Sequence, residues 1–412
     1  MRERVERVAR SYGSVALLGA VGVPIGVAVG AVDAVFGRTL LAIGDLRATH
    51  PALIVCLPAA GALIAWAYLR LGKNTGRGMG LVFDVGHGHE DAIPLRLVPL
   101  IMGGTWLTHL CGGSAGREGV AVQIGATLSH WVGQHLPLKN PGNTFLVVGM
   151  AAGFAGLFGT PLAATLFALE VLVAGRLEYR ALLPSLVAAL AASTTSGALG
   201  LAKFEVALSA PLTLDAGTLA CLLVLGVAFG VVGGGFAWLL GGAKRILGAR
   251  LENPIVRIVS VGAAVAVCLL ALGQGRYAGL GTNLIAASFA EEGSGVLAWD
   301  WLLKLALTIA TLAAGFQGGE VTPLFAIGAT LGATLARPLG MDAGLVAALG
   351  YAAVFGSATN TLLAPILIGG EVFGFAYLPA FFLVCSVAYL FNQDKSIYAL
   401  QERMGSHVSV RK

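Results

Sequence analysis

The 412-residue sequence contains few charged residues. Asp, Glu, Lys and Arg make up 11% of the chain, against about 25% in a typical soluble domain. Hydrophobic residues make up 57%, and the mean hydropathy is +0.84, which excludes an ordinary soluble enzyme. The apolar runs are continuous and do not alternate with polar residues, which excludes a membrane β-barrel. The chain is therefore expected to be an all-α polytopic membrane protein, long enough for about ten crossings of ~20 residues.

Several functional signatures are also missing. The five cysteines are scattered and form no disulfide framework or CxxC pair. No GxxxxGK[ST] phosphate loop is present, which argues against an ATP-driven pump. No basic cluster is interleaved with aromatic residues, so we expect no nucleic-acid partner. We expect no enzymatic activity, no cofactor and no metal. The run His87–Asp91 (HGHED) could bind a metal, but it lacks further ligands at a suitable spacing, and a solvated loop is favoured.

Basic residues mark the expected cytoplasmic side of a membrane protein. They cluster at both ends of the chain and in loops near residues 70–77, 176–180 and 244–257. Between Ala181 and Ala243, Lys203 is the only basic residue. Both termini are therefore expected in the cytoplasm and the middle of the chain outside, so that each half crosses an odd number of times. Residues 1–10 are expected to form an amphipathic surface helix, and residues 406–412 a cytoplasmic tail.

The sequence contains an internal repeat. Residues 116–128 align with 319–331 at an offset of 203, and residues 150–171 align with 351–372 at an offset of 201, both without gaps. Nine of the 22 positions in the second pair are identical. We infer a first membrane repeat over 11–205 and a second over 206–405, which together form one integral membrane domain. Because each repeat crosses an odd number of times, the two are inverted, as in transporters and channels with a midplane substrate site.

Glycine-rich turns interrupt the apolar segments at 76–80, 112–119 and 318–323, and each leads into an apolar helix. The free N–H groups at such helix starts bind anions, and Pro323 would suit the first helical position, where its missing N–H costs nothing. These broken helices predict a path for a small anion. Glu118 lies at one of the helix starts, and an ionisable group at membrane depth is a functional candidate. Its carboxylate could occupy the anion site and leave it on protonation. Its equivalent in the second repeat is Val321.

Other polar residues have competing interpretations. Arg117 could be an ion-pair partner or a charge at the pathway entrance. Glu170 and Glu371 are repeat equivalents near helix ends, where helix capping is favoured. Residues 112–116 match the G-x-S-x-G pattern of serine hydrolases. An intramembrane serine protease, with Ser114 and either His109 or His130, is therefore a distant alternative.

The same residues resemble the CLC family of anion channels and transporters. Residues 116–120 (GREGV) are similar to the family motif G-[KR]-E-G-P, and 318–323 (GGEVTP) to G-G-x-F-x-P. Residues 78–82 (GMGLV) take the place of G-S-G-I-P, so that Met79 replaces the anion-binding serine. Tyr398 matches the pore tyrosine. The order and spacing of the four motifs agree over nearly the whole chain.

Two departures, together with the GREGV form of residues 116–120, resemble the fluoride-specific branch of this family. Met79 replaces the serine, and Val171 follows Glu170 where chloride/proton exchangers carry an internal proton glutamate. The resemblance implies a fluoride/proton antiporter that exports fluoride. It also implies that Glu118 is the gate and proton carrier, that Met79 lines the anion site, and that the N–H groups of Glu320 and Val321 face the anion. By the same resemblance, Thr322 offers a hydroxyl and Tyr398 closes the inner side.

The resemblance further implies a homodimer in the bacterial inner membrane, with fluoride, protons and the lipid bilayer as partners. The nearest alternative is a chloride channel or chloride/proton exchanger of the same fold. The loss of the serine and of the internal glutamate argues against that alternative. A thioether is a poor anion ligand, so the sulfur of Met79 does not itself account for a preference for fluoride.

Overall fold

The computed structural model describes residues 2–136, 141–208, 212–290 and 293–404, and within these the side chains from Leu18 onward except those of residues 141–142. The described chain is helical, as expected from its continuous apolar runs. Its helices are α1 (Arg2–Thr49), α2 (Leu57–Ala67), α3 (Met79–Gly86), α4 (Leu97–Leu110), α5 (Glu118–Gln134), α6 (Pro141–Phe158), α7 (Pro161–Glu170), α8 (Leu182–Ala198), α9 (Ala216–Arg250), α10 (Pro254–Ala271), α11 (Thr282–Phe289), α12 (Asp300–Ala314), α13 (Val321–Leu339), α14 (Ala343–Thr359), α15 (Leu363–Phe373) and α16 (Leu378–Leu390).

The remaining regular structure is short. Turns of 3₁₀ or π helix lie at Pro51–Cys56, Tyr68–Gly72, Thr75–Arg77, Tyr179–Ala181 and Phe375–Tyr377. Strands β1 (Val173–Ala174) and β2 (Glu402–Arg403) form one parallel pair, which joins the segment after α7 to the segment after α16. The expected all-α fold is therefore confirmed.

The helices differ widely in length, as the interrupted apolar segments indicated. Five described segments are long and apolar enough to cross a membrane: Leu18–Thr49, Pro51–Gly72, Tyr179–Ala198, Ala216–Arg250 and Pro254–Ala271. Several other apolar helices have only 10–17 residues. The chain length allows about ten crossings of ~20 residues, and the structure has shorter apolar helices beside the long ones. The expected surface segment 1–10 is also continuous with the next apolar run, since α1 is one helix from Arg2 to Thr49.

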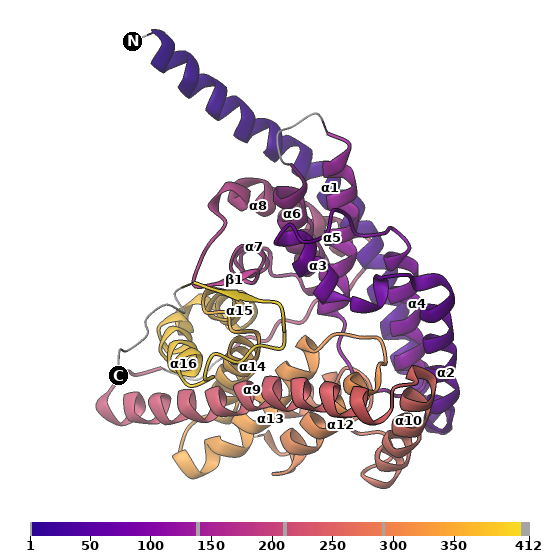
Figure 1. Ribbon diagram of the computed structural model, residues 1–412. Coiled ribbons are helices and arrows are strands. Elements are labelled where there is room, and N and C mark those ends of the chain that lie inside the picture. Colours follow the sequence, from indigo (N-terminus) through magenta and orange to yellow (C-terminus); the bar gives the residue numbers. More distant parts are fainter. Residues whose placement is uncertain (1, 137–140, 209–211, 291–292, 405–412) are drawn as a thin grey trace, which may run out of the picture.

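Each half contains a tightly crossed pair of antiparallel helices. In the first half, α5 crosses α6 where Gly125 meets Gly149, and in the second half α13 crosses α14 where Gly328 meets Gly350. At all four glycines, an added Cβ would overlap the carbonyl oxygen of the opposite glycine. Small residues allow such close backbone approach in membrane helices. In Figure 1, α5, α6 and α8 lie above α13, α14 and α16, so that the two halves occupy different parts of the molecule.

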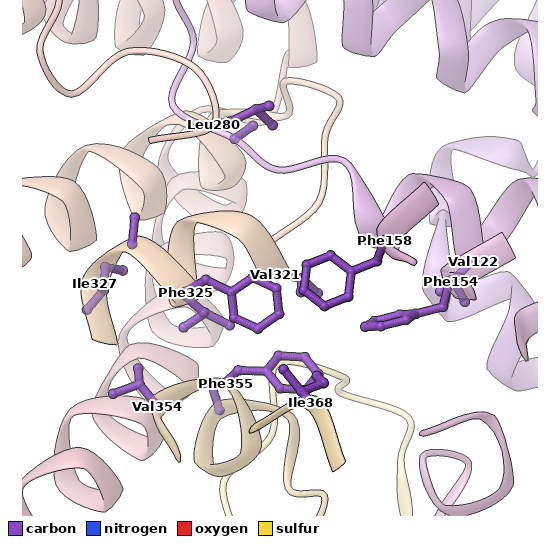
Figure 2. Close-up of a cluster of buried hydrophobic side chains, with 14 of the residues drawn as sticks. Val122, Phe154, Phe158, Leu280, Val321, Phe325, Ile327, Val354, Phe355 and Ile368 are labelled. Atoms are coloured by element: carbon purple, nitrogen blue, oxygen red, sulfur yellow. The ribbon is translucent and has the colours of Figure 1, made fainter. Parts of the chain in front are cut away.

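Aromatic rings join the two halves. Figure 2 shows Phe154 and Phe158 of α6 facing Phe325 of α13 and Phe355 of α14. The rings of Phe158 and Phe325 stack with their centroids 5.1 Å apart, and those of Phe154 and Phe355 lie 6.4 Å apart. All four residues are buried. This cluster fixes the position of one half against the other.

Two glutamates cap helices of the opposite half. Glu170, the last residue of α7, accepts hydrogen bonds from the backbone N–H groups at the start of α15, at 2.9–3.2 Å from Leu362, Leu363 and Ala364. Glu371 near the end of α15 accepts from Leu162 and Ala163 at the start of α7, at 3.0 and 2.8 Å. The expected capping role is confirmed. The arrangement is reciprocal, because each helix caps the start of its repeat equivalent.

Candidate functional site

The site lies where glycine-rich loops of the two halves meet. Gly116 and Gly319, which are repeat equivalents, form an isolated antiparallel bridge. The Gly116 N–H donates to Gly319 O at 2.5 Å, and the Gly319 N–H donates to Gly116 O at 2.8 Å. The three predicted helix starts are confirmed, because α3 begins at Met79, α5 at Glu118 and α13 at Val321. Pro323 is the third residue of α13, not the first as expected; its missing N–H still belongs to the unbonded first turn.

The loops approach so closely because glycine leaves room. An added Cβ at Gly116 would lie 2.8 Å from Cδ of Pro323, and one at Gly319 would lie 2.9 Å from the backbone nitrogen of Gly119. Such distances are too short for a real side chain. The start of α5 is therefore held against the start of α13, which brings Glu118 to the N-terminus of the opposite helix.

The Glu118 carboxylate occupies that helix N-terminus. It is 0% exposed, and its Oε2 accepts hydrogen bonds from the backbone N–H of Thr322, at 3.1 Å, and from the Thr322 hydroxyl. Its Oε1 lies 3.4 Å from Nε of Arg117, so that the ion-pair alternative for Arg117 is the one observed. The free N–H groups of a helix start attract anions. The carboxylate therefore stands where a small anion would bind.

A cleft of about 590 Å³ lies next to the starts of α3 and α13. Met79, Glu320 and Tyr398 line it, and Tyr398 is buried with its ring stacked on Phe83 at 5.2 Å between centroids. The cleft also has basic lining residues, which favour the entry of anions. They are Lys73, Arg77, Lys244 and Arg257. Nζ of Lys244 lies 3.7 Å from Oε1 of Glu320.

The predicted site residues are thus brought together, in two groups. Thr322 contacts Glu118 directly, and Val321 is buried beside it in the first turn of α13. Met79, Glu320 and Tyr398 lie around the cleft. The N–H group that reaches Glu118 belongs to Thr322, whereas the N–H groups of Glu320 and Val321 were the ones expected to face the anion. That expected anion contact stays a prediction.

Gln123 was not among the predicted site residues. This residue is buried on α5 and also lines the cleft. Its amide nitrogen donates to Gly119 O at 3.1 Å, while its Oε1 has no hydrogen-bond donor within the described part of the chain. A polar amide in the otherwise apolar segment 119–126 was the signal that could have identified it.

Two other sequence signals lie outside this group. Val171, at the position of the missing internal glutamate, is 0% exposed, and the neighbouring Glu170 is used as a helix cap. The His87–Asp91 run lies in turns after α3. Within the residues that the structure describes, no three His, Cys, Asp or Glu side chains are grouped as metal ligands.

The serine protease alternative is not supported. The Ser114 hydroxyl contacts Nζ of Lys304 and the hydroxyl of Thr308, both at 2.9 Å. The two ring nitrogens of His109 contact the carbonyl oxygens of Thr105 and Ala115, and Nε2 of His130 contacts Asp91 O. No nucleophile–base pair of the expected kind forms, because neither ring is directed at the serine.

Comparisons with known proteins identify the family of this chain. The family described as voltage gated chloride channel matches residues 60–393. A "Chloride/fluoride channel protein" of Pseudomonas syringae pv. tomato is 38% identical over 383 residues, which cover 90% of this chain and 83% of the relative. The solved structure of a CLC-type fluoride/proton antiporter is 53% identical, covers 95% of this chain and 99% of its own, and superimposes with a TM-score of 0.93.

More distant structures share the fold. A slow cyanobacterial chloride/proton antiporter is 19% identical with a TM-score of 0.80, and the match covers 93% of this chain and 96% of that one. A eukaryotic CLC transporter is 18% identical with a TM-score of 0.73, over 94% of this chain and 73% of that one. The chain belongs to the voltage gated chloride channel family, also called the CLC family.

Proposed function

We propose that this CLC protein exports fluoride from the cytoplasm in exchange for protons, with Glu118 as both gate and proton carrier. The observation that carries the proposal is the buried carboxylate of Glu118 at the N-terminus of α13, bound by the N–H and the hydroxyl of Thr322. An anion that binds there must displace this carboxylate. A proton on Glu118 removes the negative charge that the helix start attracts. One side chain can therefore couple proton binding to anion entry.

The donors at this position suit fluoride. Fluoride is small and strongly hydrated, and it must exchange water for N–H and O–H donors to enter a buried site. Thr322 supplies one of each. Val171 leaves the internal proton position without an ionisable group, so that Glu118 would carry the proton alone. The similarity to a fluoride/proton antiporter at 53% identity supports the same function.

The membrane arrangement follows from the basic residues. We place both termini in the cytoplasm of a bacterium, and the cleft lined by Met79 and Tyr398 on the cytoplasmic side, where its four basic residues meet fluoride. Residues 11–205 and 206–405 are the proposed inverted repeats. In this proposal the protein is a homodimer in the inner membrane, which the mass of the purified protein in detergent would test.

The experiment is a paired flux measurement in liposomes. Fluoride efflux and proton uptake are recorded together, with chloride as a competing load. We expect fluoride efflux to drive protons inward, and Glu118→Gln to stop proton movement. Asp45→Asn, a change at an exposed carboxylate of α1, serves as the control and is expected to behave like the wild type.

The same measurement separates the alternatives. The name of the Pseudomonas relative makes a chloride or fluoride channel the second candidate. Fluoride flux without protons would indicate a channel, and equal chloride flux would indicate a chloride transporter. Intact proton uptake in Glu118→Gln would contradict the role of Glu118.

A further inference from the structure

Lys304 is a fully buried lysine in the second turn of α12, and among the described residues it forms no salt bridge with an acidic side chain. Its exposed fraction is 0%. Its ammonium donates to Gly279 O at 2.7 Å, to the Ser114 hydroxyl at 2.9 Å and to Tyr277 O at 3.1 Å. All three acceptors are neutral. A buried charge is costly, and an ionisable group within a membrane helix is a functional candidate for that reason.

The contacts of Lys304 hold the gate loop, which is the glycine-rich segment 112–119 that carries Glu118. Ser114 lies four residues before Glu118. Besides its contact with Lys304, its hydroxyl is 2.9 Å from that of Thr308, and its backbone N–H donates to the Thr311 hydroxyl at 3.3 Å. Lys304, Thr308 and Thr311 lie on one face of α12, because residues spaced by four and three share a helix face. One helix of the second half is therefore hydrogen-bonded to the gate loop of the first half.

A second loop is tied into the same arrangement. Lys304 binds two carbonyl oxygens of the segment between α10 and α11, and the Gly279 N–H of that segment donates to Gly113 O at 3.2 Å. Gly281 makes room for the lysine, since an added Cβ there would lie 2.8 Å from Cε of Lys304. Lys304 is thus the side chain that connects α12, this segment and the gate loop.

The repeat shows that the fold does not require a lysine here. At the offset of 203, Lys304 corresponds to Ile101 of α4, and both side chains are buried. Thr308 and Thr311 correspond to Thr105 and Thr108, so that the two helix faces differ at the lysine. The loop of the second half carries Val321 where the first carries Glu118. The helix that contacts the loop of Glu118 carries a lysine. Its repeat equivalent carries an isoleucine, and the equivalent loop carries Val321.

We propose that Lys304 is a positioning residue for the gate: it fixes the main chain of residues 113–116, so that only the side chain of Glu118 moves during exchange. This role rests on the proposed function. A fixed loop keeps the carboxylate aligned with the N–H and hydroxyl of Thr322. A loosened loop lets fluoride pass while the carboxylate is displaced without a proton. Lys304 therefore contributes to coupling rather than to the binding of fluoride itself.

The test compares Lys304→Met with Lys203→Met. Lys203 is the matched control because its ammonium donates to Gly156 O and, at 2.8 Å, to the Ser196 hydroxyl, but to no residue of the gate loop. In Lys304→Met we expect continued fluoride efflux with roughly tenfold fewer protons moved per fluoride, since a small misplacement of a reacting group has large effects. Lys203→Met is expected to keep the wild-type ratio. Ser114→Ala, which leaves Lys304 two carbonyl partners, should lower the ratio less and covers the case in which Lys304→Met does not fold.

A second readout does not depend on coupling. Backbone amide exchange of residues 113–119 should accelerate in Lys304→Met and not in Lys203→Met. The wild type moving fluoride without protons would contradict the proposed function, while the exchange measurement would still decide whether Lys304 holds the loop. An unchanged proton ratio in both Lys304→Met and Ser114→Ala, or an equal drop in Lys203→Met, would overturn the positioning role. Unchanged amide exchange in Lys304→Met would overturn it as well.

Discussion

The two glycine-rich loops that meet at the site both lead into apolar helices, but they carry different side chains. Gly116 and Gly319 pair with each other, and each loop begins an apolar helix that crosses its neighbour at a glycine pair. The polar groups do not repeat. Glu118 corresponds to Val321, Gly119 to Thr322 and Lys304 to Ile101. Features that build the fold occur in both halves, whereas features that carry the proposed chemistry occur in one. A side chain of one half can therefore bind the helix start of the other.

The largest expected effect tests the shared features. Gly149→Ala and Gly350→Ala should each destabilise the protein by about 3 kcal/mol or more, because the new Cβ overlaps a backbone carbonyl that cannot move aside. The thermal unfolding midpoint in detergent measures this. Gly235→Ala is the control, since an added Cβ there meets no atom within 4 Å. A loss of stability in only one of the two variants would show that the two helix crossings are not equivalent.

The reciprocal caps should differ in strength. Glu170 accepts three backbone N–H groups and Glu371 accepts two. Replacing either by Gln removes the charge and turns an amide NH₂ toward N–H donors. We expect losses of about 2–3 kcal/mol for Glu170→Gln and about 1–2 kcal/mol for Glu371→Gln in unfolding experiments. Glu252→Gln, at an exposed position, is the control. A larger loss of stability for Glu371→Gln than for Glu170→Gln would show that the number of hydrogen bonds does not set the strength of the two caps.

The next effect concerns a position that does not repeat. Thr322→Val keeps the shape of the side chain and removes the hydroxyl that binds Glu118, while Thr322→Ser keeps the hydroxyl. We expect the apparent fluoride affinity in liposome flux to weaken roughly tenfold in the valine variant, as for one hydrogen bond to a charged group. The serine variant should stay close to the wild type. Equal affinities in the two variants would mean that the backbone N–H alone binds the anion.

The smallest effect concerns the charge of the cleft. Nζ of Lys244 lies 3.7 Å from Oε1 of Glu320. Glu320 is the repeat equivalent of Arg117. Lys244→Gln should lower fluoride efflux about two- to threefold at low ionic strength, because it removes one of the charges that attract anions. The difference should vanish at high salt, where such charges are screened. A deficit that persists at high salt would show that Lys244 acts by direct contact.

Much of the fold could be predicted from the sequence. The two gapless alignments, at offsets of 203 and 201, indicated the repeats, and the glycine runs located the helix starts at Met79, Glu118 and Val321. Glu118 stood out because a carboxylate is rare in an apolar segment. Lys304 had the same signal but no motif around it. The partner of each glutamate cap was also hidden, since Glu170 and Leu362 are 192 residues apart.

The sequence by itself determined the local features of this protein: apolar helices, glycine breaks and one carboxylate at a helix start. These features depend on neighbouring residues, whose composition and spacing are visible along the chain. Only the tertiary structure decided that the Glu118 carboxylate binds at Thr322 and that Lys304 grips the loop of Ser114. Both contacts cross from one half to the other. Their geometry depends on how closely the glycine crossings and the aromatic cluster bring the halves together, which no local pattern encodes.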